Sequence, residues 1–507
     1  MTQFTIRQLL DAGRGDAIAI AAPSAPGLTY DRLRDQIAGT LAALNAVGIG
    51  RNDRVAIVLP NGPEMATAFM GVASAATSAP LNPGYRSEEF EFYLSDLGAR
   101  ALIVDAGSGS PAIDVARKLG IAVFTARSLP EQGAGRFILE TAVSAPAKPR
   151  QGGPAEADDV ALVLHTSGTT SRPKIVPLSQ RNVWTSARNI SRWVSFSPSD
   201  RGLTIMPLFH IHGLLAGILA PLSAGSSVFC TPGFNALKFF SWMDEAHPTW
   251  YTAVPTMHQA ILTRATHNRD IIKANPLRFI RSSSSPLPPQ VIAELEATFG
   301  APVIEAYGMT EAAHQMACNP LPPAMRKPGT VGLPAGQDVA IMDTHGNLLS
   351  AGEVGEIVIK GENVTSGYEN SPKANEDAFA NGWFRTGDQG VKDADGYISV
   401  TGRLKEIINR GGEKISPREV DEVLMNHPAV LQVVTFGIPH DKLGEEVGAL
   451  VVLREGLAAT ERELRDFVAE RLADFKVPRR LLFMDDIPKG ATGKLQRIGL
   501  AKKLGLG

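Results

Sequence analysis

VALVLHTSGTTSRPK, residues 160–174, runs from an apolar, strand-like segment into a loop rich in hydroxyl groups. Glycine in such a loop lets backbone N–H groups approach an anion closely, hydroxyl groups add donors, and a lysine adds a positive charge. This combination predicts polyphosphate binding, although a Ser/Thr-rich surface turn has a similar composition. The Walker A pattern GxxxxGK[ST] is absent, which argues against an ordinary P-loop NTPase. The predicted phosphate-binding residues are Thr166, Ser167, Gly168, Thr169, Thr170 and Lys174.

Strand-like runs and longer amphipathic segments alternate through the first part of the chain. Apolar residues recur at helical spacing in residues 30–47 and 288–299. The alternation predicts an α/β fold of doubly wound, largely parallel sheets with helices on both faces. Such sheets bind ligands beyond the carboxyl ends of their strands, where TSGTTSRPK and YGMTE (307–311) both lie. The strand-like runs are residues 55–60, 101–105, 121–126, 160–166, 226–230 and 250–254.

The pattern changes twice in the second half of the chain. Short strands punctuated by glycine follow residue 330 and predict a mixed or antiparallel β-subdomain. Beyond GRLKEI (402–407), helical and strand-like segments form a compact α+β unit. We therefore predict a large domain over residues 1–402 and a small mobile domain over residues 403–507, with a hinge near Lys405.

Two helices of the small domain have their own start signals. In SPRE, Ser416 is the predicted N-cap, Pro417 occupies the first helical position and Glu419 closes a capping box. TERE (460–463) repeats the capping-box pattern. The most linker-like stretch of the chain is residues 144–159, which we expect to connect two subdomains on the surface.

Composition excludes several classes of protein. The 507 residues exceed the ceiling of roughly 250–300 residues for one hydrophobic core, so at least two domains are expected. A net charge of -2 gives no polycationic surface for nucleic acid. Cys230 and Cys318 suit core filling in a reducing compartment rather than a disulfide framework. The start of the chain lacks the apolar stretch of a signal peptide, so we expect a cytoplasmic protein with no membrane partner.

Six motifs together resemble the adenylate-forming superfamily of acyl-CoA synthetases, aryl-CoA ligases, luciferases and peptide-synthetase adenylation domains. The resemblance covers essentially the whole chain, with the motifs in the family's order. One departure is Ile175, where the family commonly has glycine, which could stiffen the phosphate loop or alter nucleotide handling. The motifs are TSGTTSRPK (166–174), PLFHIHG (207–213), YGMTEA (307–312), GWFRTGD (382–388), GRLKEIINRGGEKISP (402–417) and PKGATGK (488–494).

The resemblance implies a reaction in two halves, in which ATP activates a carboxylate and CoA then displaces AMP. It implies that Glu311 holds Mg²⁺, Thr310 bonds the α-phosphate and Tyr307 stacks on adenine. It implies that Asp388 and Arg403 hold the ribose from two sides. The alternative for each of these two residues is a surface ion pair. The implied nucleotide site also includes Ser283, Ser284, Glu305 and Ala306.

The same resemblance assigns roles in the small domain. Lys494 matches the lysine that bridges carboxylate and phosphate oxygens, and only a closed arrangement of the domains could bring it to ATP. Lys405 matches the pivot, and Gly411 and Gly412 offer bare backbone for pantetheine in a second arrangement. Acetylation of Lys494 by a lysine acetyltransferase would remove the charge that the first half-reaction needs. With Thr310, Glu311 and His210, this lysine completes the predicted catalytic set.

Three side chains bear on the choice of acid. His210 matches the family's gate between acyl and CoA sites, and His314 and Ser284 fall where the family lines its acyl pocket. A pocket of imidazole and hydroxyl groups suits a small second carboxylate better than an alkyl chain or aromatic ring. A structural histidine at 314 and a zinc site at His210 and His212 are the alternatives, but zinc lacks a third ligand nearby in sequence.

These local strings look most like the oxalate:CoA ligase branch, which implies oxalate as the substrate. Malonate, a medium-chain acid or a hydroxycinnamate is the alternative acid within the same reaction. Adenylation for a carrier protein and light-emitting oxidation are less favoured, because INRGGEKISP (408–417) resembles CoA ligases. The tripeptide Arg14–Asp16 reads RGD, an adhesion motif that occurs often by chance and conflicts with a cytoplasmic protein.

Overall fold

The computed structural model describes residues 4–141, 147–166, 173–488 and 497–506. Parallel pairing dominates a first sheet, with the antiparallel strands β7 and β9 at its two edges. Its order is β7 (Phe137–Thr141), β6 (Ala122–Ser128), β5 (Ala101–Asp105), β3 (Arg54–Val58), β4 (Thr77–Pro80), β8 (Val160–Thr166) and β9 (Lys174–Ser179). The predicted strands at residues 101–105 and 160–166 coincide with β5 and β8.

A second sheet has the same character, with parallel strands in the middle and antiparallel strands at its ends. Its order is β16 (Leu333–Pro334), β15 (His314–Cys318), β14 (Val303–Met309), β13 (Phe279–Ser283), β12 (Trp250–Ala253), β10 (Arg201–Thr204), β11 (Ser227–Cys230), β1 (Ile18–Ala22) and β2 (Ala25–Thr29). The sequence predicted that the strand before YGMTE stops at residue 306. This strand, β14, continues to Met309 because its last residues pair with the antiparallel strand β15. The doubly wound α/β prediction is confirmed.

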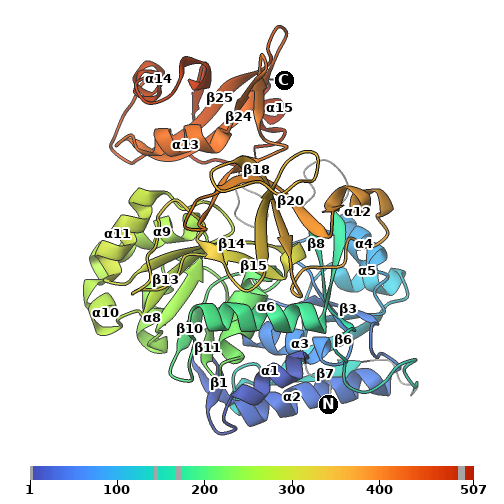
Figure 1. The fold of residues 1–507 in the computed structure, drawn as a ribbon. Helices are drawn as coiled ribbons and strands as arrows, with labels where there is room; N and C mark the ends of the chain where they lie inside the picture. The colour runs from blue at the N-terminus through green and yellow to red at the C-terminus, as the bar shows by residue number, and fades with distance from the viewer. Residues whose placement is uncertain (1–3, 142–146, 167–172, 489–496, 507) are drawn as a thin grey trace.

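Helices between the strands follow from local sequence. In α2 (Tyr30–Ala46) the side chain of Thr29 accepts from the N–H of Arg32, and one face of the helix is buried. α11 (Pro289–Phe299) starts with proline in its first turn and ends at Gly300, whose φ of 64° suits glycine. Together with α3 (Pro63–Ala73), α6 (Gln180–Trp193), α8 (Phe239–Ala246) and α9 (Pro255–Ala265), these helices pack around the sheets, as Figure 1 shows.

The β-subdomain and the C-terminal unit follow in order. β17 (Asp338–Met342), β18 (Val354–Lys360), β20 (Trp383–Lys392), β19 (Phe379–Ala380) and β21 (Ile398–Arg403) form an antiparallel sheet. The next sheet consists of β22 (Ile408–Arg410), β23 (Glu413–Ile415), β24 (Val430–His440), β25 (Gly444–Leu453) and β26 (Arg480–Phe483). It carries α13 (Pro417–Met425) and α14 (Glu461–Ala469) and lies above β18 and β20 in Figure 1.

The predicted hinge near Lys405 falls between β21 and β22, which belong to different sheets. Hydrogen bonds cross this junction, because Ser416 and Arg418 of the C-terminal unit donate to the backbone carbonyls of Thr401 and Val400. The exact boundary at residues 402 and 403 stays a prediction.

The two predicted helix starts have different outcomes. Thr460 and Glu463 form the complete capping box, with Thr460 N–H donating to the Glu463 carboxylate at 2.7 Å. Ser416 caps α13 as predicted, but the box with Glu419 is wrong. The ammonium of Lys476 donates to both carboxylate oxygens of Glu419 at 2.7 Å, and a charged donor outcompetes a backbone N–H.

Other sequence predictions concern isolated features. Cys230 and Cys318 are both buried free thiols, as expected. The predicted inter-subdomain linker instead joins β7 to β8 of one sheet, and Asp159 at its end accepts from Arg51 at 2.6 Å. No helix among the described residues is both long and apolar enough to cross a bilayer. The cytoplasmic location stays a prediction.

Ile175 belongs to β9 rather than to the phosphate loop. It pairs with His165 of β8, and its side chain is only 4% exposed in an apolar cluster that also contains Leu81 and Val163. The side chain therefore points into the core, and its effect on nucleotide handling stays a prediction. Its contribution is to anchor the strand that follows the loop.

We predict that Ile175→Ala lowers the free energy of unfolding by about 2–5 kcal/mol, because it removes buried methyl groups and leaves a cavity. Chemical denaturation measures this change. Ile138→Ala in β7 is the matched control. Because Ile138 is 44% exposed, this substitution should change the free energy of unfolding little. A variant of unchanged stability with an altered KM for ATP would instead support a role in nucleotide handling.

Candidate active site

Predicted site residues gather where the strands of the two large sheets end. Ser283 ends β13 and pairs with Ala306 of the neighbouring parallel strand β14. The short helix η5 (Thr310–Ala312) directly follows β14 and carries Thr310 and Glu311. From the other sheet, β8 ends at Thr166, opposite Lys174 of β9. Both sheets supply residues to one region, because His165 of β8 and Thr310 after β14 line the same small cavity.

Glu311 is held by a tyrosine that the sequence did not single out. The hydroxyl of Tyr368 donates to Glu311 Oε1 at 2.7 Å, and Glu311 is 6% exposed. The ammonium of Lys174 lies 4.2 Å from the centre of the Tyr368 ring, a cation–π contact. Burial raises the pKa of Glu311, while Tyr368, Arg403 and Lys174 act against that shift. Tyr368 thus contacts both a carboxylate and a lysine of the predicted site.

The donor set around Glu311 suits a hard divalent cation that arrives with phosphate. Mg²⁺ is usually bound through one or two carboxylates plus substrate phosphates, so one carboxylate is sufficient. Within the described ranges, no group of three His, Cys, Asp or Glu side chains gathers as an all-protein metal cage. A cation at Glu311 would also offset the burial that raises the pKa of this carboxyl.

Asp388, Arg403 and Tyr307 form a second polar group. Asp388 on β20 lies opposite Arg403 on β21, and the Arg403 Nε to Asp388 Oδ1 distance is 3.0 Å. The Tyr307 hydroxyl donates to Asp388 Oδ2 at 2.5 Å. Burial and the negative charge of Asp388 raise the pKa of Tyr307, which keeps the phenol protonated as a donor. The structure thus brings together the three residues expected at adenine and ribose.

A buried cluster of imidazole, hydroxyl and guanidinium groups lies beside this region. His212 Nδ1 is 3.1 Å from Ser284 Oγ, and His212 Nε2 is 2.7 Å from Thr252 Oγ1. The rings of His212 and His314 stack with centroids 4.8 Å apart. Arg281 Nη2 lies 3.1 Å from His314 Nε2. Ser284 and His314, predicted in the acyl pocket, are therefore joined through His212, and the hydrogen bonds to both His212 nitrogens argue against zinc.

His210 lies at a small cavity rather than in that cluster. The cavity has a volume of about 50 Å³ and also borders Thr310, so the predicted gate and the predicted α-phosphate ligand share one space. His165 lines it and is 3.0 Å from the Asp96 carboxylate. The remaining lining residues are Pro80, Leu81, Asn82, Tyr85, Tyr93, Leu164 and Phe209.

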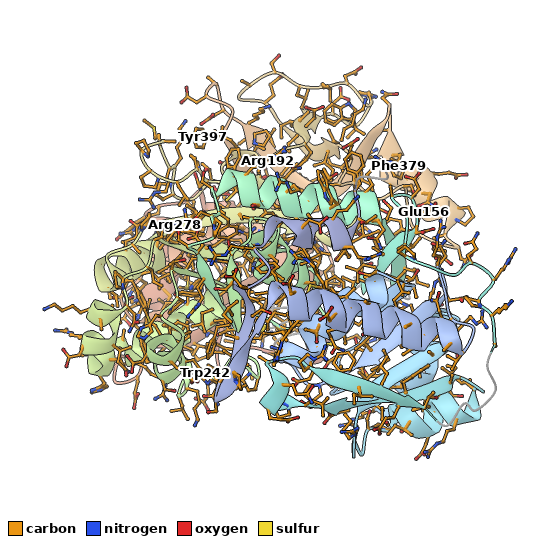
Figure 2. All side chains as sticks on the ribbon, turned by 90° about the horizontal axis from the view of Figure 1, so that it is seen from below. Glu156, Arg192, Trp242, Arg278, Phe379 and Tyr397 are labelled. Atoms are coloured by element: carbon orange, nitrogen blue, oxygen red, sulfur yellow. The ribbon has the colours of Figure 1, made fainter. Side chains whose placement is uncertain are left out.

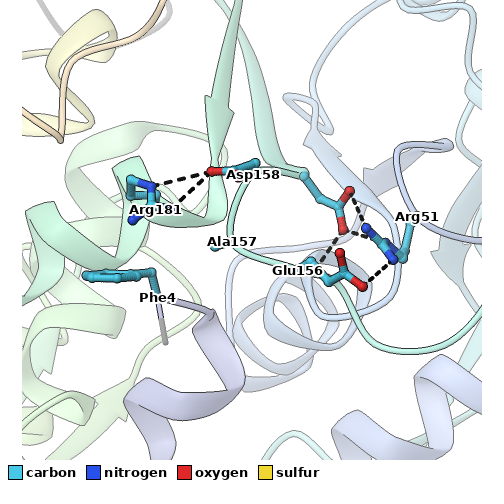
Figure 3. Close-up of a pocket in the computed structure, with 7 residues that line it drawn as sticks. Phe4, Arg51, Glu156, Ala157, Asp158 and Arg181 are labelled. Atoms are coloured by element: carbon cyan, nitrogen blue, oxygen red, sulfur yellow. Dashed lines mark hydrogen bonds and ion pairs between the residues drawn. The ribbon is translucent and has the colours of Figure 1, made fainter. Parts of the chain in front are cut away.

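A larger hollow of about 350 Å³ contains none of the predicted site residues. Figure 3 shows its charged side chains bonded to one another. Arg51 bonds to Asp159 and Glu156, both at 2.6 Å, and Arg181 bonds to Asp158 at 3.2 Å. Because these charges satisfy one another, the hollow has the character of a surface ion-pair network.

Several predicted site residues lie outside the described residues or away from the contacts above. Ser167, Gly168, Thr169, Thr170 and Lys494 lie outside the described residues. Lys405 is exposed in the turn after β21. Gly411 and Gly412 connect β22 to β23, with φ values of 61° and 101° that a tight hairpin turn requires. Their expected roles stay predictions.

Glu305 and Ala306 serve the strand framework. The Ala306 carbonyl accepts from the Ser283 hydroxyl at 2.9 Å, which ties β13 to β14. Glu305 is buried and accepts from the N–H of Gly329 at 3.1 Å. Burial raises the pKa of Glu305 from 4.5 to about 8, so this side chain is largely protonated at neutral pH. Its expected contact with nucleotide stays a prediction.

Two family models match the sequence of this chain. Residues 10–369 match the family described as AMP-binding enzyme, and residues 419–494 match the AMP-binding enzyme C-terminal domain. The chain belongs to the AMP-binding enzyme family. It is similar to an oxalate–CoA ligase of Arabidopsis thaliana, with 46% identity over 95% of this chain and 94% of that protein.

Two further relatives of this AMP-binding enzyme extend the comparison. An oxalate–CoA ligase of Saccharomyces cerevisiae is 44% identical, covering 87% of this chain and 84% of the yeast protein. The crystal structure of ATP-bound MatB from Rhodopseudomonas palustris superposes with a TM-score of 0.88 at 29% identity, covering 100% of this chain and 98% of MatB. Sequence and fold therefore agree along nearly the full length.

We predict that Glu305→Gln changes how stability depends on pH. Between pH 4.5 and about 8 the unfolded chain releases a proton that folded Glu305 keeps, so the wild type loses stability as pH rises. The free energy of unfolding of the variant should fall less steeply with pH than that of the wild type, by up to about 1.4 kcal/mol per pH unit. Denaturation at several pH values measures this slope, with the exposed Glu294→Gln as control. Parallel slopes for Glu305→Gln and wild type would contradict the shifted pKa.

Proposed function

We propose that this chain is an ATP-dependent oxalate:CoA ligase. The reaction converts oxalate, ATP and CoA into oxalyl-CoA, AMP and pyrophosphate. Relatives named as oxalate–CoA ligases support the choice of acid, because they match nearly the whole chain. The observation that carries the proposal is the buried cluster of His212, Ser284, Arg281 and His314, whose polar and cationic groups suit a small anion.

The first half-reaction joins a carboxylate oxygen to the α-phosphorus of ATP as the bond to pyrophosphate breaks. Two anions must approach, so positioning and charge neutralisation are the main contributions of the protein. Thr310 would donate to the α-phosphate, and Lys174 would offset the charge of the outer phosphates. Glu311 would hold Mg²⁺ with phosphate oxygens, where the ion neutralises part of their charge.

Asp388 and Arg403 would fix the ribose of the nucleotide. Asp388 is 5% exposed, and its two oxygens already accept from Tyr307 and Arg403 at 2.5 and 3.0 Å. This network sets the orientation of the carboxylate before nucleotide arrives, which supports a preorganised site. A ribose hydroxyl would donate a hydrogen bond to a remaining lone pair of the same oxygens.

In the second half-reaction the sulfur of CoA attacks the carbonyl carbon of the adenylate. The thiol proton is released, and the bond between that carbon and the AMP oxygen breaks. The cavity shared by His210 and Thr310 lies between the expected α-phosphate ligand and the expected acyl gate, which supports thiol entry there. Gly411 and Gly412, at an exposed hairpin of the C-terminal unit, would approach it after rotation about the hinge near Lys405.

We predict that Lys494→Ala abolishes formation of the adenylate but spares formation of the thioester from supplied acyl-adenylate. The lysine supplies charge between the two reacting anions only in the first half-reaction. Pyrophosphate release measures the first half, and thioester yield measures the second. Lys503→Ala is a control lysine of the same unit. Equal losses in both half-reactions would contradict this division of roles.

The choice of acid is tested by pyrophosphate release with oxalate, malonate, acetate, medium-chain acids and coumarate. We predict the highest kcat/KM for oxalate, and a loss of about 10- to 150-fold for oxalate in His314→Ala, since a hydrogen bond to a charged group is removed. The KM for ATP should change little. Oxalate turnover at background level in the wild type would end the assignment to oxalate.

A further inference from the structure

Arg281 is a buried cation whose partners are neutral. It lies on β13, is 1% exposed and hydrogen-bonds to Thr252, Gln315 and two histidines. Within the described ranges, no carboxylate forms an ion pair with it. Burial lowers the pKa of Arg281, which expresses the cost of its charge in this environment. A buried charge with no counter-ion is costly unless something else compensates it.

The nearby thiol does not supply the missing charge. Cys318 lies close enough to interact with Arg281, but burial raises the pKa of this thiol to about 12. Cys318 is therefore neutral at physiological pH. Glu305 is on the neighbouring strand, but it pairs with Ser282, whereas Arg281 pairs with Ile304, so the two side chains leave opposite faces of the sheet.

Arg281 fixes the protonation pattern of both imidazoles. A guanidinium only donates, so the ring nitrogen that faces it must accept. Arg281 Nη2 is 3.1 Å from His314 Nε2, and Arg281 Nη1 is 3.3 Å from His212 Nε2. In a neutral imidazole the proton is then on Nδ1, and His212 Nδ1 donates to Ser284 Oγ at 3.1 Å. Both imidazoles thus present an acceptor nitrogen to Arg281.

Unusual backbone surrounds the same side chains. Ser284 and His314 have φ values of 75° and 97°, a region that residues other than glycine rarely adopt. Gly308 allows the backbone of β15 to approach closely, since a Cβ at residue 308 would lie 2.1 Å from the His314 carbonyl oxygen. His212 begins a π-helix, His212–Leu219, a rare form that occurs frequently at functional sites. The structure holds this cluster in a strained but defined arrangement.

We propose that Arg281 is a positioning residue that makes the enzyme select acids carrying a second carboxylate. Its charge attracts the second carboxylate, and its two arms hold the imidazoles of His212 and His314 in place. The inference rests on the proposed function, since it names the residue that selects the acid for that site. A purely structural role for Arg281 would affect all acids equally.

The test compares oxalate with oxamate, in which a neutral amide replaces one carboxylate of nearly the same shape. In Arg281→Met we expect kcat/KM for oxalate to fall about 100-fold, while that for oxamate changes less than about threefold. Arg281→Lys keeps the charge without the two-armed geometry and should recover part of the preference. If both acids lose equally, or if both variants keep the wild-type ratio, the inference is overturned.

The control is Arg278→Met, three residues earlier in the chain, because Arg278, labelled in Figure 2, bonds to Asp200 at 2.9 Å and to the Val194 carbonyl instead of to the cluster. This variant should keep the wild-type ratio of kcat/KM for oxalate to kcat/KM for oxamate. Thermal unfolding reports whether each variant folds, and Arg281→Lys decides the matter if Arg281→Met does not fold. If the wild type uses malonate but not oxalate, the proposed acid is wrong, and malonate with malonamate tests Arg281 instead. A wild type that uses neither dianion overturns both.

Discussion

Parallel pairing of the central strands is the constraint on which the site depends. Parallel strands bring their carboxyl ends to one edge, so each loop that follows a strand opens in the same direction. β13 and β14 place Ser284 and Thr310 there, while β8 and β9 of the other sheet bring Lys174 to the same region. The Lys174 contact with Tyr368, whose hydroxyl bonds to Glu311, joins the two sheets at this edge.

The buried charges of the site are compensated in two ways. Where nucleotide is expected, charge is balanced within the protein, because Asp388 bonds to both Tyr307 and Arg403. Where the acid is expected, Arg281 has only neutral partners among the described residues. A preformed balanced network suits a ligand recognised by hydrogen bonds, whereas an unbalanced cation suits a ligand that supplies a charge.

Local sequence predicted the elements well and the pairing of side chains less well. Hydrophobic runs located β5 and β8 because a buried parallel strand needs only a short apolar stretch. Glu419 was misassigned because Lys476, from a distant segment, takes its carboxylate. Arg281 had a detectable signal, since an arginine within the buried strand FIRSS breaks the apolar pattern expected there. Tyr368 had none, because only folding brings it to Glu311.

By itself the sequence determined the alternation of strands and helices, the adenylate-forming motifs and the position of TSGTTSRPK at the end of β8. These features depend on spacing and turn chemistry over a few residues, so they can be recognised without a fold. Only the tertiary structure decided that Ile175 faces the core, that His212 links Ser284 to His314, and that Arg281 lies behind both imidazoles. Such contacts join residues far apart in the chain, and their geometry follows from how the sheets pack.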